Sequence, residues 1–349
     1  MAVLATLRLS LPRPRLRAAA LLLCGSSLAL GATVGVSAGS TAGAPHQARA
    51  HLAASFQAGV ADEKTEMFSD ALWQRLHTHI TRYIVPYDAA VRPYSLSLAR
   101  QWIAAAEVHH QQVLVAFYHS EYTPTRMPSI ATYEHDTKKF IKLFPNVRQY
   151  QPWNETNRGN VRYTYERFNS PTAVESAKYY QALRRVCSHC TILGLDILDQ
   201  AEVGPTLSYI GQFKAELHHL RVPTPTLWGL HNYSDTNRFS SARTRAILAA
   251  VPGQVWLTET GGIVKFGGAF PNSRGSGLSR AAKALGYMFA LASTNSRIKR
   301  LYIYEWSGGT QSTIFDAGLT DVHHHPRPGY IIVCAHMHVA HCKVKVSSH

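Results

Sequence analysis

Short apolar segments alternate with amphipathic segments along most of the chain. Each apolar segment is β-prone and ends in polar residues, and helical spacing then follows, as with Leu98, Trp102 and Ala106. The expected strands are Ser55–Ala61, His79–Pro86, Gln112–Tyr118, Val147–Trp153, Thr191–Leu198, Pro225–Tyr233, Gly253–Glu259 and Arg300–Trp306. The expected helices are Met67–His77, Ser95–His109, Ala131–Leu143, Ser170–Val186, Thr206–Leu220, Ser241–Ala250, Ser279–Ala292 and Pro328–His338.

Eight strand–helix pairs in this order predict a (β/α)8 barrel, a single α/β domain over residues 55–340 with a short C-terminal tail at 341–349. The alternative is an open, doubly wound sheet. Such a sheet usually has a glycine-rich phosphate loop after its first strand. Here Asp62-Glu63-Lys64 follows the first strand, and no G-x-G-x-x-G occurs in the chain, so the pattern favours the barrel.

The first forty residues predict an export signal. Four arginines lie between residues 8 and 17, Ala18–Leu30 is apolar, and Val36–Ala38 is a small-residue cleavage site. An uncleaved membrane anchor is the alternative, but glycine and serine interrupt the apolar run. We therefore expect residues 1–40 to be removed and 41–54 to form a linker or disordered mature N-terminus. The mature protein is then secreted or associated with the cell envelope, without stable membrane insertion.

The chain is basic, with a formal net charge of +15, and is 46% hydrophobic, which allows a sizeable core. Its lysines and arginines are scattered, and no zinc-finger, RNP or basic-zipper pattern occurs. We therefore expect no nucleic-acid partner. Weak attraction to acidic glycans or other anionic surfaces is the milder inference from the charge.

Four cysteines remain once the signal is removed. In an exported protein, Cys187 and Cys190 predict a local disulfide rather than a cytosolic redox motif. Cys334 and Cys342 could pair only if the last helix ends between them, because eight helical residues span about 12 Å. The histidines around this pair suit zinc in type but not in spacing, so we expect neither a metal nor a cofactor.

Polar residues gather where the expected strands end, and in a (β/α)8 barrel chemistry sits on the loops at those ends. Strand four ends in Asn154-Glu155 and strand seven in Thr258-Glu259. Paired carboxylates carry out glycoside hydrolysis: one protonates the leaving oxygen, and the other attacks the sugar carbon or activates water. The two glutamates therefore predict a sugar-cleaving site at the barrel mouth.

Residues 55–340 resemble the clan A glycoside hydrolases, which are retaining enzymes built on a (β/α)8 barrel. The resemblance rests on Asn154-Glu155 after strand four and on Glu259 in W-L-T-E-T-G-G at strand seven. It implies that Glu155 is the general acid/base, that Glu259 is the nucleophile and that Asn154 binds a sugar hydroxyl. It also implies that Glu155 is protonated near neutral pH through a raised pKa, whereas Glu259 is ionised through a lowered pKa.

Three further residues are expected in the site on the same resemblance, and a fourth, His231, from its place at the end of strand six. Tyr233 would bond the nucleophile, Trp306 would form a flat floor for a sugar ring, and Arg82 would keep Glu259 ionised. His231 could line the subsite or be an ordinary core histidine. The expected partner is a carbohydrate, a polysaccharide or oligosaccharide with β-linkages, and the working expectation for the assembly is a monomer. The alternatives are a carbohydrate-binding barrel without catalysis and an adhesin for acidic polymers.

Overall fold

The computed structural model describes residues 55–160, 169–339, 342 and 344–346, all within the compact unit His51–His349. The expected export signal at 1–40 and linker at 41–54 lie outside the described residues, as does part of the 341–349 tail. Among the helices of the described ranges, none combines the length and apolar character needed to cross a membrane.

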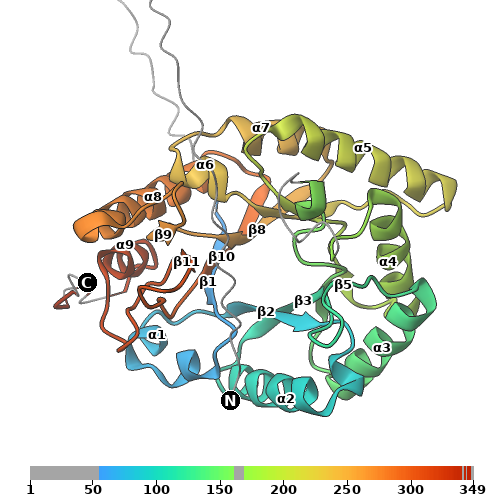
Figure 1. Cartoon of the computed structure of the whole chain (residues 1–349), viewed down its shortest axis with the longest axis horizontal. Helices are drawn as coiled ribbons and strands as arrows, with labels where there is room; N and C mark the ends of the chain where they lie inside the picture. Colours follow the sequence, from blue (N-terminus) through green and yellow to red (C-terminus); the bar gives the residue numbers. More distant parts are fainter. Residues whose placement is uncertain (1–54, 161–168, 340–341, 343, 347–349) are drawn as a thin grey trace, which may run out of the picture. The chain divides into compact units, whose positions relative to one another are not determined.

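Strands and helices alternate in the expected order (Figure 1). The strands are β1 Gln57–Ala61, β2 Ile80–Pro86, β3 Gln112–Tyr118, β4 Gln149–Gln151, β5 Thr191–Ile192, β6 Asp196–Leu198, β7 Leu227–His231, β8 Gln254–Thr260, β9 Lys265–Phe266, β10 Ile298–Tyr304 and β11 Phe315–Asp316. The α-helices are α1 Ala71–Gln74, α2 Pro93–Val108, α3 Ile130–Leu143, α4 Ala173–Val186, α5 Val203–His219, α6 Tyr233–Asn237, α7 Ala242–Ala250, α8 Ser276–Ser293 and α9 Pro328–His336.

The barrel strands pair in parallel as two sheets, ordered β2-β3-β4-β5 and β1-β10-β8-β7-β6. β5 and β6 together occupy the one strand expected at Thr191–Leu198. Between β1 and β2 the ladder is interrupted, yet the strands are so close that a Cβ on Gly59 would meet the Ile80 carbonyl oxygen. Helices surround the strands (Figure 1), so the predicted (β/α)8 fold is confirmed, with a hydrogen-bonded ladder that does not close completely.

The barrel interior has an apolar lower layer and a polar upper layer. The lower layer contains Ile80, Leu114, Leu193, Trp256 and Tyr302, which form one buried cluster. One alternation further along the strands, buried polar side chains replace them, beginning with Arg82 on β2 and Gln151 on β4. Burying charged groups is costly unless they are paired, so this polar layer requires a complete network of partners.

The helices pack over the outer faces of the strands and enclose the main hydrophobic core. Local sequence signals explain where several of them begin. In α4, Thr172 and Glu175 form a capping box, which satisfies backbone donors at the helix start. At the end of the chain, α9 stops at His336, and Cys334 is bonded to Cys342. The expected disulfide between Cys187 and Cys190 is also present.

Candidate active site

A pocket of about 460 Å³ opens at the carboxyl ends of the strands, where both predicted catalytic glutamates reach it. Its floor includes Asn154, Glu155 and Glu259. Its walls are largely aromatic, formed by Tyr118, Tyr233, Phe266, Phe270, Tyr304 and Phe315. A polar floor beneath apolar walls suits a ligand with a hydroxylated edge and apolar C–H faces, as a sugar has.

Glu155 follows β4 in a left-handed backbone conformation, with φ 47°, which is uncommon for a residue other than glycine. The backbone on both sides is tied to neighbouring segments. Asn154 N–H donates to the Phe117 carbonyl at 2.8 Å, and Thr156 N–H donates to the Asp196 carbonyl at 3.0 Å. These bonds hold the turn that directs the buried Glu155 side chain into the pocket floor.

Glu259 faces the barrel interior because β8 contains a β-bulge. Gly229 of β7 pairs with Trp256, but His231, two residues later, pairs with Glu259, which is three residues later in β8. An extra residue of this kind re-aims a side chain. As a result, the adjacent residues Thr258 and Glu259 both bond to groups inside the barrel.

Arg82 is the central cation beneath the pocket. Its guanidinium donates to Glu259 Oε2 at 3.0 Å, Asp196 Oδ2 at 2.7 Å, Asn154 Oδ1 at 2.6 Å and Gln151 Oε1 at 2.8 Å. Asp196 also accepts from a threonine hydroxyl of β8, and the cations outweigh its burial and lower its pKa. The charges of the polar layer are therefore paired within the barrel.

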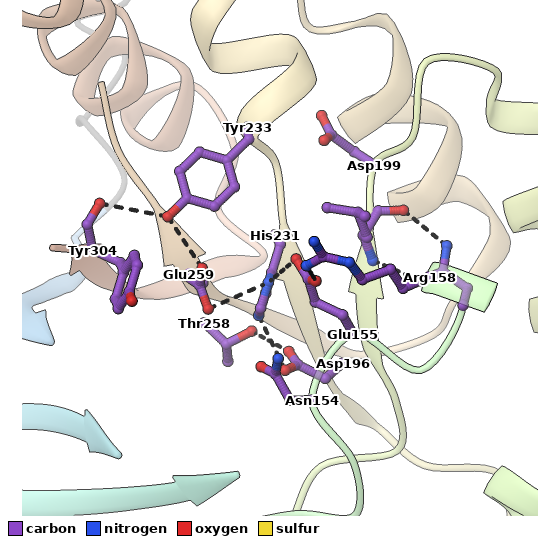
Figure 2. A network of polar contacts seen from close by, with 12 residues as sticks. Asn154, Glu155, Arg158, Asp196, Asp199, His231, Tyr233, Thr258, Glu259 and Tyr304 are labelled. Carbon is purple, nitrogen blue, oxygen red and sulfur yellow. Dashed lines mark hydrogen bonds and ion pairs between the residues drawn. The ribbon is translucent and has the colours of Figure 1, made fainter. Parts of the chain in front are cut away.

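His231 lies between the two glutamates (Figure 2). Its Nδ1 is 3.1 Å from Glu155 Oε1 and 3.6 Å from Glu259 Oε2, and its Nε2 is 3.0 Å from Asp196 Oδ2. Burial alone would lower the pKa of His231, but Asp196 and Glu259 outweigh it and raise that pKa to about 10. The imidazole is thus held as a cation between three carboxylates at neutral pH.

The pKa values of the two glutamates are shifted in the directions opposite to the sequence-based expectation. Burial would raise the pKa of Glu155, but the ion pair with Arg158 and the proximity of His231 lower it to about 2. Burial raises the pKa of Glu259 despite the opposing effects of His231 and Arg82. The expectation overlooked Arg158, three residues after Glu155, which keeps that carboxylate ionised when no ligand is bound.

Tyr233 is positioned by the short helix α6, which begins directly after β7. The Asp199 carboxylate accepts the two backbone N–H groups that follow Tyr233, each at 2.8 Å. Asn237 bonds the Tyr233 carbonyl and also bridges to the loop after β8. The Tyr233 hydroxyl consequently donates to Glu259 Oε1 at 3.2 Å, the contact expected from the sequence (Figure 2).

Trp306 does not reach the pocket, contrary to the expectation that it floors a sugar site. It is fully buried, its indole N–H donates to Asp70 Oδ2 at 3.1 Å, and its ring packs against Tyr330. β10 ends at Tyr304, so strand alternation does not extend to Trp306. Arg82 and His231 also lie below the pocket rather than in its lining, so they act on the carboxylates and not on a ligand.

Sequence reasoning missed most of the aromatic wall. Tyr304 could have been found, because it follows the inward-facing Tyr302 by one alternation of β10. Phe266 and Phe315 could not, because they meet only through the antiparallel pairing of β9 with β11, which joins the loops after β8 and β10. Their rings lie 5.6 Å apart in an edge-to-face contact.

Three side chains of this site have the geometry of a possible metal centre. Ligand atoms of Glu155, His231 and Glu259 all lie within 4.8 Å of one another. Arg82 and Arg158 already pair with the two glutamates, so positive charge is supplied by the protein itself. The arrangement fits acid–base chemistry between carboxylates better than it fits cation binding.

No protein-family model matches the chain, and no curated protein matches it. Solved structures do match. Xylanase 10B from Thermotoga maritima has a TM-score of 0.55 and 14% identity, covering 81% of this chain and 95% of its own. Endo-1,4-beta-xylanase XylE from Penicillium canescens has 0.58 and 12%, covering 84% and 97%. A family 39 glycoside hydrolase from Bacteroides cellulosilyticus WH2 has 0.53 and 16%, covering 80% and 63%.

At these identities the likeness concerns the fold. The matched proteins are xylanases and related glycosidases of clan A, the group that Asn154-Glu155 and Glu259 suggested from the sequence. The similarity therefore bears out the expected fold: the chain shares its (β/α)8 barrel with these glycoside hydrolases.

Proposed function

We propose that the chain hydrolyses O-glycosidic bonds of a β-linked polysaccharide or oligosaccharide by a retaining mechanism. The observation that carries the proposal is the placement of two buried glutamates at one pocket floor, where an oxygen of Glu155 and an oxygen of Glu259 lie within 4.8 Å. Retaining glycosidases hold their carboxyl groups about 5–5.5 Å apart, whereas inverting enzymes leave about 6.5–9.5 Å for a water molecule. The signal expected at residues 1–40 favours action outside the cytoplasm.

In the first step, Glu259 attacks the anomeric carbon and forms a glycosyl–enzyme ester while the bond to the leaving oxygen breaks. Glu155 gives its proton to that oxygen. In the second step, Glu155 takes a proton from water, which attacks the anomeric carbon and releases Glu259. Because Glu259 carries no charge while glycosylated, Glu155 loses its proton more readily in the intermediate.

The surrounding residues supply the proton and the orientation. His231 is cationic and its Nδ1 lies 3.1 Å from Glu155 Oε1, so it can pass a proton to Glu155 for the acid step. Asn154 lines the pocket, and its side-chain oxygen Oδ1 accepts a hydrogen bond from Arg82. The side-chain N–H groups of Asn154 would then donate to a sugar hydroxyl. Hydrogen bonds from Tyr233 and Arg82 orient the Glu259 carboxylate.

A carbohydrate-binding barrel without catalysis is the second candidate, and the ion pair between Glu155 and Arg158 favours it. An acid/base that stays ionised cannot protonate a leaving group. The two candidates differ in one respect: a hydrolase must break this ion pair when substrate binds, whereas a binding protein retains it.

The proposal is tested with the variants E155Q and E259Q on two substrates with the same sugar. One carries a dinitrophenyl leaving group, which needs no protonation, and the other is an unactivated oligosaccharide. E155Q should lose about 10²–10⁴-fold in kcat on the oligosaccharide. On the dinitrophenyl glycoside E155Q should still release a burst of phenolate and accumulate a covalent sugar on Glu259. E259Q should be inactive on both substrates.

The exposed Glu66 provides a matched control, and E66Q should behave as the wild type. The anomeric configuration of the first product is read by NMR. Net inversion would contradict the retaining mechanism, and sugar binding without turnover over a broad panel of β-linked glycans would favour the second candidate.

A further inference from the structure

The pocket has two unlike sides, one next to each glutamate. Figure 2 shows Tyr233 and Tyr304 beside Glu259. His231 separates these side chains from Glu155. In a retaining reaction the nucleophile bonds to the anomeric carbon, whereas the acid/base contacts the leaving oxygen. The sugar that is transferred to the enzyme therefore lies on the Glu259 side, and the rest of the substrate extends past Glu155.

A two-stranded ribbon, β9 paired with β11, covers the Glu259 side and joins the loops after β8 and β10. Backbone bonds hold it in shape: Phe266 N–H donates to the Phe270 carbonyl at 2.8 Å, and Phe270 N–H donates back at 3.1 Å. The Phe315 ring lies 5.6 Å from the Phe266 ring, 5.6 Å from the Tyr233 ring and 6.2 Å from the Tyr304 ring. The ribbon is thus packed directly onto the residues around the nucleophile.

The ribbon side offers apolar surface to a ligand. The lining residues that the ribbon and its flanking segments contribute are Ile263, Phe266, Ala269, Phe270 and Phe315. Apart from Glu259 and the tyrosines, the polar lining residues come from the segments after β4, β6 and β7. The C–H face of one sugar suits this wall. A second sugar would bring further hydroxyl groups against it, and buried hydroxyl groups without partners are costly.

The size of the pocket sets a limit in the same direction. Its volume of about 460 Å³ lies near the small end of the range of about 300–1,000 Å³ that is usual for ligand sites. An enzyme that cuts inside a glycan chain needs an open groove on both sides of the cleaved bond. Here the ribbon closes one of those sides.

Resting on the proposed function, we propose that the enzyme is exo-acting: it removes a single terminal sugar from the non-reducing end of a β-linked glycan. Phe266 and Phe315 of the ribbon determine this specificity, because their rings end the pocket on the Glu259 side. The bond that breaks joins the anomeric carbon of the terminal sugar to the oxygen of the next one. Water supplies the hydroxyl group for the released sugar and the proton for that oxygen.

The test uses β-linked oligosaccharides with a fluorescent label on the reducing end. A second set carries, in addition, a bulky ether on the non-reducing terminal sugar. The wild type should shorten the free-ended chains by one sugar at a time, and the ether should lower kcat/KM by about 100-fold, because it clashes with the wall. Labelled fragments of several lengths from the start of the reaction would overturn the proposal.

Replacement of Phe266, whose side chain is at the pocket rim and 40% exposed, tests the wall itself. F266A should lower kcat/KM for the free-ended chains by about tenfold and weaken the discrimination against the ether to a similar extent. F315A should act in the same direction. The matched control is F239A, because Phe239 is 48% exposed and contacts Tyr287 away from the pocket lining, and it should keep both values. Full discrimination in folded F266A and F315A, checked by circular dichroism, would refute the role of the ribbon.

Binding to E259Q, measured by isothermal titration calorimetry, separates this inference from the proposed function. Binding of the free-ended ligand that is about tenfold or more tighter than binding of the ether supports the single-sugar pocket even if no glycan is hydrolysed. Equal binding of the two ligands, together with internal cleavage by the wild type, would overturn the exo specificity and leave the hydrolase intact.

Discussion

The charge on a single side chain, Glu155, depends on which neighbours contact it. Its carboxylate is buried, which by itself favours the neutral form, yet Arg158 and His231 lie beside it and lower its pKa to about 2. Glu259 lies on β8 and is bonded by Arg82. Its pKa is nevertheless raised, because the effect of burial dominates there. The protonation state of Glu155 therefore depends chiefly on the position of Arg158.

Replacing Arg158 by glutamine should move the basic limb of the pH profile. The acid step requires protonated Glu155, so kcat/KM falls as pH rises through the pKa of that group in the free enzyme. Loss of the cation raises this pKa, and the limb should shift to higher pH on a neutral substrate. The measurement is the pH dependence of kcat/KM for R158Q. The control is R245Q, in which the exposed Arg245 is replaced, and its profile should match that of the wild type. A limb that stays in place in R158Q would show that another group controls it.

At the residue scale, the sequence predicted which residues reach the pocket better than it predicted the contacts that those residues make. Asn154, Glu155, Tyr233 and Glu259 reach the pocket because strand ends meet at one rim, which a linear pattern reveals. Trp306 does not, because alternation ends with the strand. The effect of Arg158 on Glu155 depends on a left-handed turn, which no local pattern announced.

Among the elements, the five-residue helix α6 has a structural importance beyond its length. It starts with Tyr233 and ends with Asn237, whose amide bonds the carbonyls of Tyr233 and Gly261 and accepts from Ile263 N–H. The helix therefore fixes the hydroxyl that bonds Glu259 and also anchors the loop after β8.

Replacing Asn237 by alanine should destabilise the fold and disturb the site together. The change leaves buried backbone groups without partners, at about 1–3 kcal/mol each, so we expect the free energy of unfolding to fall by about 2–4 kcal/mol. Urea denaturation measures this loss. The control is N146A, since Asn146 bonds Glu107 on the surface, and it should change stability by less than about 0.5 kcal/mol. Unchanged stability in N237A would refute the anchoring role.

Element types and their order could be predicted from hydrophobic spacing, but several local irregularities could not. The strand expected at Thr191–Leu198 divides into β5 and β6, and the expected β7 strand gives way to α6 at Tyr233. The bulge that turns Glu259 inward depends on pairing with His231 in a neighbouring strand. Such features arise from contacts between elements and leave no period in the sequence.

On the scale of the whole molecule, stability should fall as the solution becomes alkaline. Burial, followed by repulsion from Asp62, raises the pKa of Glu305 from 4.5 to about 8. The stabilising contribution of neutral Glu305 is complete below pH 4.5 and is lost as pH rises through about 8. The pKa of Asp199 is also raised by burial, which acts in the same direction.

The variant E305Q cannot ionise, so it should lose less stability than the wild type between about pH 5 and 8. Urea denaturation at several pH values gives the two curves. E66Q, altered on the surface, should follow the wild type. Parallel curves for E305Q and the wild type would exclude Glu305 as a source of the alkaline loss.

The division of the barrel into two sheets has a consequence for how activity could be assembled. Arg82 and the segment carrying Glu155 belong to the sheet β2-β3-β4-β5, whereas His231 and Glu259 belong to the other sheet. Neither half contains both carboxylates, and the ion pairs of Arg82 join the two sheets across their seams. If the chain were cut between β5 and β6 and the two fragments expressed separately, each fragment would contain only one of the two glutamates. Sugar cleavage by the mixed fragments would therefore report directly on their reassociation.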